Sequence, residues 1–226
     1  MAAFRKAVEL GAGFIETDLQ LSKDGRLVAI HDTELGRTTN GSGPVRACTL
    51  DELRSLDAGS WFGREFAGER IPTIEEILPF AREHDVVFYL ELKAGAAWGI
   101  EHSLVTSLRT AQAAANTVVL SFDASALRTV MRQDAMMLCG LLYDDERSDA
   151  ISTALSVSAR QLAPRGDRVT PELVEKAQHA GLQVITWTIN QAEQMRALIA
   201  AGVNGIMTDF PEQLVAVVGE MRAGKP

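Results

Sequence analysis

The fold is decided by a stretch near the start of the chain, Gly13-Phe14-Ile15-Glu16-Thr17-Asp18, in which an apolar strand-like run leads into two carboxylates. A second apolar run, 86–90, leads into Glu91-Leu92-Lys93 in the same manner. Because side chains alternate across a strand, Glu16 and Asp18 face the same way. The same alternation places Lys93 on the side of Glu91. If both strands belong to one parallel α/β barrel, these side chains converge at the carboxyl ends of the strands, where such barrels carry their chemistry.

The segment His31-Asp32 adds a histidine to this group. It follows the apolar run 27–30 directly, and imidazole suits proton transfer near neutral pH. The other three histidines, His84, His102 and His179, fall on or at the ends of predicted helices among polar neighbours. We therefore expect those three on the surface, and His31 is the candidate acid or base.

Three carboxylates in one place need a counter-charge, because close carboxylates repel one another and resist ionisation. Oxygen-only ligands favour a hard cation, so Glu16, Asp18 and Glu91 are predicted to hold one divalent ion, Ca²⁺ or Mg²⁺. Two alternatives stay open at this point. A strand-end Glu-x-Asp can be the solvated start of a loop, and Lys93 can form a structural ion pair with Glu91 or Asp18.

The composition fits a sizeable core with an acidic surface. The chain has 226 residues, 46% of them hydrophobic, and a net charge of −8. α/β barrels of this length are often one domain, and a nucleic-acid partner would require a basic patch instead. No apolar run reaches the roughly 20 residues that span a bilayer. Cys48 and Cys139 are too few for a disulfide framework or a zinc site, so we expect two buried or partly buried thiols.

The order of the predicted elements indicates a parallel sheet with helices outside, because strands and helices alternate at short spacing. The predicted strands are 13–18, 26–30, 86–92, 117–121, 137–142, 160–163, 182–187 and 205–208. The predicted helices open the chain and then cover 73–84, 99–114, a segment from Asp123, 147–157, 170–180, 190–201 and a segment from Pro211. Counting 26–30 as an extension of the strand before it gives seven βα units, one fewer than a closed (β/α)₈ TIM barrel requires.

The stretch 33–72 does not follow this alternation. It is rich in Gly, Thr, Ser and Arg, and Thr49-Leu50-Asp51-Glu52 is typical of a helix capping box. We expect a single barrel domain over 1–226, with 33–72 as a small insertion that lies over the active-site face.

At these segments the chain resembles the glycerophosphodiester phosphodiesterases, in order and over nearly its whole length. The motifs that carry the resemblance are Ile15-Glu16-Thr17-Asp18, Asp24-Gly25, His31-Asp32, Arg37-Thr38-Thr39-Asn40-Gly41, Ile71-Pro72-Thr73, Leu90-Glu91-Leu92-Lys93, Ser121-Phe122, Trp187-Thr188-Ile189-Asn190 and Gly202-Val203-Asn204-Gly205-Ile206-Met207-Thr208-Asp209. The resemblance implies a TIM-type barrel in which 33–72 is the family's insertion after the second strand.

The resemblance also implies roles for the acidic cluster and its neighbours. Glu16, Asp18 and Glu91 would ligate the metal, and His31 would be one of two histidines that act as general acid or base. Lys93 would hold the phosphate.

Two aromatic residues are further candidates for substrate binding. The resemblance implies that Trp187 lines the substrate end of the pocket, and Phe122 directly follows the predicted strand 117–121. A place in the barrel core stays open as the alternative for both side chains.

The chain departs from the family pattern at its start. Family members open with a strand that ends in His-Arg-Gly and continue with a Pro-Glu-Asn-Thr helix cap, and neither segment occurs in this sequence. The first predicted helix has no Ser, Thr, Asp or Asn to cap it. We expect this chain to be less stable and less active than a form that carries the strand, because unpaired strand edges and interior apolar groups would be exposed.

The implied reaction is metal-dependent hydrolysis of a glycerophosphodiester to sn-glycerol 3-phosphate and an alcohol, in glycerol and phospholipid metabolism. The expected partner is this small-molecule substrate, and the expected location is the cytoplasm. Water and the substrate's own hydroxyl both stay open as the nucleophile. Two other functions also stay open: a related barrel phosphodiesterase that acts on lysophospholipid or sphingomyelin, and a non-catalytic barrel that binds a phosphodiester.

Overall fold

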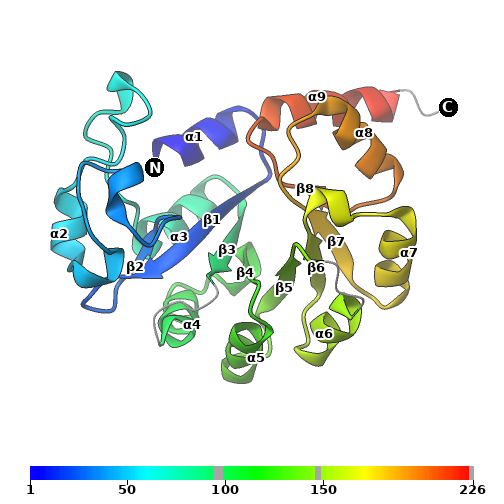
Figure 1. Ribbon diagram of the computed structural model, residues 1–226, viewed down its shortest axis with the longest axis horizontal. Coiled ribbons are helices and arrows are strands. Elements are labelled where there is room, and N and C mark those ends of the chain that lie inside the picture. Colours follow the sequence, from blue (N-terminus) through cyan, green and yellow to red (C-terminus); the bar gives the residue numbers. More distant parts are fainter. Residues whose placement is uncertain (94–98, 146–148, 224–226) are drawn as a thin grey trace.

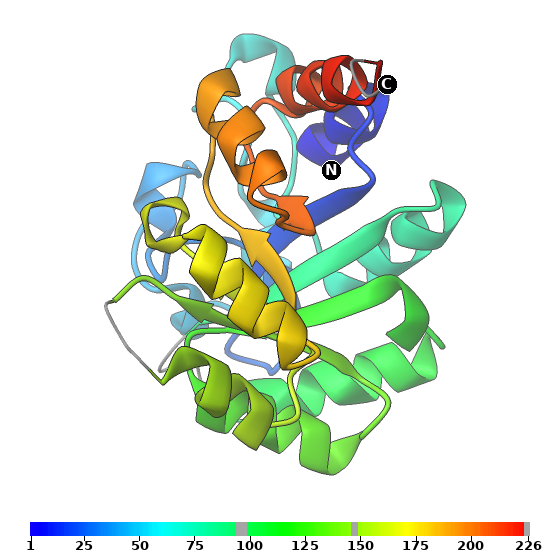
Figure 2. The same ribbon diagram turned by 90° about the vertical axis from the view of Figure 1, so that its right-hand side faces the viewer.

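The computed structural model describes residues 1–93, 99–145 and 149–223. Its strands are β1 (Phe14–Leu21), β2 (Leu27–Ala29), β3 (Val87–Leu92), β4 (Thr117–Ser121), β5 (Leu138–Tyr143), β6 (Gln161–Pro164), β7 (Gln183–Thr186) and β8 (Gly205–Ile206). They form one sheet in the order β2-β1-β3-β4-β5-β6-β7-β8. The sheet is strongly curved, and the helices lie on its outer side (Figures 1 and 2). The predicted α/β fold of the TIM-barrel type is confirmed.

The helices follow the expected alternation with the strands. They are α1 (Ala2–Glu9), α2 (Leu50–Ser55), α3 (Ile74–Glu83), α4 (Ile100–Thr110), α5 (Ala124–Gln133), α6 (Ala150–Ser156), α7 (Pro171–His179), α8 (Ala192–Ala200) and α9 (Pro211–Ala223). Local signals set several starts: Thr170 accepts a hydrogen bond from Leu173 N ahead of Pro171, a favoured first helical residue. The helix predicted at 147–157 begins at Ala150, and positions 147 and 148 lie outside the described residues. None of the described helices is long and apolar enough to cross a membrane.

The second strand differs from the prediction. We expected 26–30 to extend the strand before it, but β1 continues to Leu21 and β2 returns antiparallel beside it, with Leu19 opposite Ala29. The turn between them contains Gly25 at a φ of 77°, a left-handed conformation that favours glycine. The remaining pairs, from β1·β3 to β7·β8, are parallel.

The two faces of the sheet bury different apolar sets, as alternation along each strand requires. The outer face packs against the helices through the larger core, to which Phe88, Leu90 and Leu92 of β3 belong. The inner, concave face holds a smaller apolar cluster: Tyr89, Val118, Leu120, Leu142, Ala163 and Ile185. Glu91 alternates with Leu90 and Leu92 and therefore belongs to the inner face.

The stretch 33–72 forms a unit with its own small core. It contains α2 and three short 3₁₀ turns, Leu35–Arg37, Val45–Ala47 and Arg64–Phe66. Thr49 and Glu52 form the predicted capping box. Buried Leu35, Val45, Leu53 and Ile71 pack with Val28 of β2 and with Ile30, so the stretch is attached through the strand that precedes it.

The curved sheet stays open between β1 and β8. Within the described residues, β1 pairs with β3 along one edge and with β2 only at Leu19–Leu21 along the other, while β8 pairs with β7 alone. The Phe14 ring covers part of this opening, since a Cβ added at Gly205 would lie 3.8 Å from Phe14 Cε2. On the outside, α1 and α9 lie side by side (Figures 1 and 2). We call this unpaired boundary between β1 and β8 the seam.

Candidate active site

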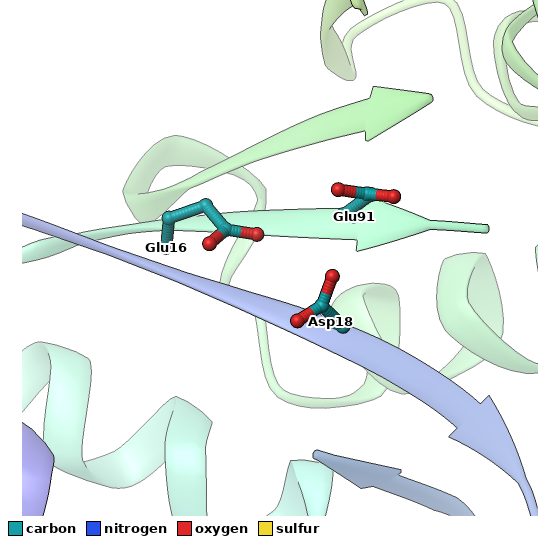
Figure 3. A group of neighbouring side chains, drawn as sticks. All are labelled: Glu16, Asp18 and Glu91. Carbon is teal, nitrogen blue, oxygen red and sulfur yellow. The ribbon is translucent and has the colours of Figure 1, made fainter. Parts of the chain in front are cut away.

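Three carboxylates meet on the inner face of the sheet, two from β1 and one from β3. Glu16, Asp18 and Glu91 each place one carboxylate oxygen so that the three atoms lie within 4.8 Å of one another. Asp18 is the register partner of Glu91, and alternation brings Glu16 to the same side. Figure 3 shows the three groups facing a shared space. The predicted convergence of these side chains is present, and their role as metal ligands remains a prediction.

Lys93 adds a positive charge to this cluster. Its Nζ lies 2.6 Å from Asp18 Oδ1 and 2.9 Å from Glu91 Oε1. Burial opposes the charge of Lys93, but hydrogen bonds and attraction from both carboxylates raise its pKa above the ordinary value. The ion pair left open by the sequence is therefore formed, and phosphate binding by Lys93 stays a prediction.

The electrostatics of the cluster oppose the ionisation of its carboxyl groups. Part of the Glu16 side chain is exposed to water. Its carboxyl group is nevertheless desolvated by the surrounding protein, and this desolvation, followed by the charges of Asp18 and Glu91, raises the pKa of Glu16 to about 8. Desolvation also raises the pKa of Glu91, against the effect of Lys93. A bound cation would reverse both effects, because it favours the charged carboxylates.

One buried oxygen of the cluster has few partners. Glu91 Oε1 is buried, and the ion pair with Lys93 Nζ at 2.9 Å is its one interaction among the described residues. Buried polar atoms normally have a partner. An acceptor-only oxygen in this state, facing two further carboxylates, fits a hard divalent cation.

His31 reaches the cluster because β2 runs back along β1. The Ile30 N–H donates to the Asp18 carbonyl at 3.0 Å, which places the following residue close to the acidic cluster. Burial raises the pKa of Glu91, and His31 is among the groups near enough to oppose that rise, in agreement with this proximity. The prediction relied on parallel strand ends. In the structure, the antiparallel return of β2 brings the histidine to the site.

Asp32, Arg37 and Gln20 hold the His31 segment, a role that was not predicted for them. Asp32 Oδ1 lies 2.7 Å from His31 Nδ1, and Arg37 binds both carboxylate oxygens of Asp32, with Nη2 at 2.8 Å from Oδ1. Gln20 Nε2 donates to the carbonyl oxygens of His31 and Asp32 at 3.1 and 2.6 Å. The only sequence signal for Arg37 was its place in one of the quoted motifs.

Trp187 and Phe122 lie together at the carboxyl ends of β7 and β4. Their rings contact edge to face at a centroid distance of 5.5 Å, and both pack on the inner apolar cluster. Trp187 Nε1 donates to the Ala163 carbonyl at 2.8 Å. Both side chains are half-buried, so they close the apolar interior and expose ring surface above it.

The remaining candidates lie as expected. His84, His102 and His179 are exposed. Cys139 is buried, which raises the pKa of its thiol to about 12, and Cys48 is half-buried.

Comparison with known proteins places this geometry in one family. The profile of the glycerophosphoryl diester phosphodiesterase family matches residues 1–213. The chain belongs to this family. A glycerophosphodiester phosphodiesterase from Caldanaerobacter subterraneus subsp. tengcongensis is 41% identical over 220 residues, which cover 96% of this chain and 90% of that relative.

Solved structures of phosphodiesterases share the fold. An Oleispira antarctica phosphodiesterase in complex with the product sn-glycerol-3-phosphate matches with a TM-score of 0.87 at 26% identity, covering 96% of this chain and 90% of the other. A glycerophosphodiester phosphodiesterase from Agrobacterium tumefaciens matches with a TM-score of 0.83 at 26% identity, covering 95% and 91%. The resemblance inferred from the motifs is therefore confirmed.

Proposed function

We propose that this protein hydrolyses glycerophosphodiesters to sn-glycerol 3-phosphate and an alcohol, as a single barrel domain with 33–72 over its active-site face. The observation that carries the proposal is the meeting of three carboxylates and Lys93 on one part of the inner face, with the backbone ahead of His31 hydrogen-bonded to Asp18 beside them. Membership of the family supports it, as does the product bound to the Oleispira relative. The setting we propose is glycerol and phospholipid metabolism in the cytoplasm.

Glu16, Asp18 and Glu91 are the proposed ligands of one Ca²⁺ or Mg²⁺ ion. When bound, the ion polarises a phosphoryl oxygen and neutralises part of the substrate's charge. The carboxylates then remain ionised, and Lys93 is less strongly held by Asp18 and Glu91. Its ammonium is free to turn toward the phosphate, whose negative charge otherwise repels a nucleophile.

His31 is the proposed proton carrier. Hydrolysis breaks one P–O ester bond while an oxygen nucleophile, water or a substrate hydroxyl, forms a new one. The leaving alkoxide must gain a proton and the nucleophile must lose one. His31 performs one of these transfers, which is worth roughly 10²–10⁴-fold in rate.

Trp187 and Phe122 are the proposed walls for the carbon skeleton of the substrate. Their exposed ring surface continues the inner apolar cluster, so it can pack against C–H groups without competing for the polar atoms of the phosphate. The hydrogen bond from Trp187 to Ala163 fixes the indole plane.

The test is a panel of substrates offered with Ca²⁺, with Mg²⁺ and with a chelator. Glycerophosphocholine and glycerophosphoethanolamine are compared with lysophosphatidylcholine and sphingomyelin, and sn-glycerol 3-phosphate is measured. The assay is run on this chain and on a form with a His-Arg-Gly strand fused ahead of Met1, with Glu16→Gln as the site variant and the surface variant Glu9→Gln as control. Metal-dependent release of sn-glycerol 3-phosphate that Glu16→Gln abolishes supports the proposal. Turnover of lysophosphatidylcholine or sphingomyelin alone, or binding of glycerophosphocholine without turnover in either form, would reject it.

A further inference from the structure

The imidazole of His31 is far more exposed than the side chains of Lys93 and Glu91. Its side chain is 63% exposed, against 25% for Lys93 and 9% for Glu91. An exposed ring with no packed surroundings samples several rotamers, and a neutral imidazole can carry its proton on either nitrogen. If His31 carries protons, a specific contact rather than packing must fix the rotamer of its ring and the nitrogen that holds its proton.

Asp32 is placed to fix both the rotamer and the tautomer of His31. Its Oδ1 lies 2.7 Å from His31 Nδ1, and the Arg37 guanidinium binds both of its oxygens. The hydrogen bonds to Arg37 and then to His31 hold the pKa of Asp32 well below its usual range. An ionised carboxylate only accepts hydrogen bonds, so the nitrogen that faces it must carry the proton.

The backbone of this segment is fixed from β1. Gln20 Nε2 donates to the successive carbonyl oxygens of Ile30, His31 and Asp32. Gln20 follows Asp18 by two residues and therefore projects from the same face of β1. The strand that carries two of the clustered carboxylates thus also sets the position of the histidine.

We propose that Asp32, held by the two-point contact with Arg37, is a positioning residue that keeps His31 in the Nδ1–H tautomer and leaves Nε2 to exchange protons with the substrate. The catalytic half of this statement rests on the proposed function, whereas the tautomer does not. A neutral imidazole so held presents a lone pair on Nε2, and after it takes up a proton there it returns that proton from the same atom.

An ordinary surface ion pair would predict something different. Exposed Arg–Asp pairs contribute about 0–1 kcal/mol to stability and need not affect a neighbouring ring. Asp134 offers a matched case in this chain, since it accepts from Arg109 Nε at 2.8 Å at the end of α5, before β5 begins. Asp134→Asn removes the same kind of pair away from the acidic cluster and serves as the control.

The decisive measurement is the ¹⁵N chemical shift of each imidazole nitrogen at about pH 8.5, where free imidazole is neutral. His31→Gln assigns the His31 signals, and the three surface histidines are internal references. We expect His31 to be protonated at Nδ1 in the parent chain and in Asp134→Asn. In Asp32→Asn the side-chain amide can donate to Nδ1, so the proton should move to Nε2. In Arg37→Gln the Nδ1–H form should persist with a broader, less ordered signal.

Kinetic measurements test the catalytic part of the proposal. They use whichever form hydrolyses a glycerophosphodiester, the parent chain or the chain with the fused strand. Asp32→Asn should lower kcat by about 10²–10⁴-fold with KM changed less than about twofold, and Asp32→Glu should recover part of the loss. A parent chain with Nε2–H at His31, or an Asp32→Asn spectrum identical to the parent's, overturns the proposal. Normal kcat in Asp32→Asn with a reversed tautomer removes the catalytic half and leaves the positioning contact. If no form hydrolyses a glycerophosphodiester, the spectra still decide the tautomer, so failure of the proposed function is separately visible.

Discussion

In the absence of a divalent cation, we expect Glu16 to make this protein less stable as the pH rises. Desolvation, followed by the charges of Asp18 and Glu91, raises the pKa of Glu16 from 4.5 to about 8. Between those two values the folded chain keeps a proton that the unfolded chain has lost. The free energy of unfolding therefore falls as the pH rises through this window and levels off above the higher value.

The size of the effect follows from the shift and from the solvent around the group. For a fully desolvated carboxyl, such a shift is equivalent to about 5 kcal/mol. Glu16 is exposed to water, and solvent screening reduces its contribution to about 1–2 kcal/mol. For a chain of 226 residues this is a change in Tm of about 2–8 °C.

The assay is thermal unfolding of the parent chain and Glu16→Gln in chelator, at about pH 5 and about pH 9. Gln keeps the shape of the side chain and does not titrate. The two proteins should have similar Tm values at the lower pH, and Glu16→Gln should be the more stable by about 2–8 °C at the higher pH. Added Ca²⁺ or Mg²⁺ should reverse that order, because the ion stabilises the ionised cluster only in the parent chain.

Glu9→Gln is the control, since Glu9 is an exposed carboxylate paired with Lys6 at 2.9 Å. It should show no comparable dependence on pH. The reasoning about Glu16 is refuted if the difference in Tm between Glu16→Gln and the parent is the same at both pH values. It is also refuted if Glu16→Gln is the less stable protein at the higher pH in chelator.

Further predictions concern the other groups of the site and the seam. His31→Ala should lower turnover by roughly 10²–10⁴-fold while the rise in Tm on adding Ca²⁺ stays unchanged; near-normal turnover would remove His31 from the mechanism. Lys93→Met should lower Tm in chelator, because two carboxylates lose their cation, and Ca²⁺ should restore most of the lost Tm. A decrease in Tm that Ca²⁺ leaves unchanged would argue against a shared cation site. Trp187→Ala should lower the free energy of unfolding by about 1–3 kcal/mol through the lost ring contact and hydrogen bond. It should also raise KM for glycerophosphocholine, whereas an unchanged KM would place the ring in the core alone. Fusing a His-Arg-Gly strand ahead of Met1 should raise both Tm and activity, and equal values with and without it would show that the seam is not a weak point.

The acidic cluster was predictable because it depends on local alternation. Glu16 and Asp18 are two residues apart on one strand, and the pleat fixes their common side wherever that strand lies in the sheet. Their meeting with Glu91 required only that two parallel strands be neighbours, which is the usual result for successive βα units.

The direction of β2 was not predictable by the same means. A strand of three residues carries too little pattern to show whether it prolongs its predecessor or pairs with it. The turn at Gly25 decides this, and the result moves His31 back along β1. The contact between Asp32 and Arg37 was also hidden, because residues five apart in an irregular segment have no periodic relationship that a sequence reveals.

The seam has a mechanical consequence for substrate binding. Backbone hydrogen bonds join each strand to the next around the curve, and none among the described residues joins β8 to β1, so a change in the curvature of the sheet at the seam breaks no ladder bond. The acidic cluster belongs to β1 and β3, whereas Trp187 follows β7 on the far arm of the curve. The distance between the acidic cluster and Trp187 therefore depends on the curvature of the sheet. A substrate that contacts both the acidic cluster and Trp187 favours one curvature of the sheet. Part of its binding free energy is then used to hold the sheet in that curvature.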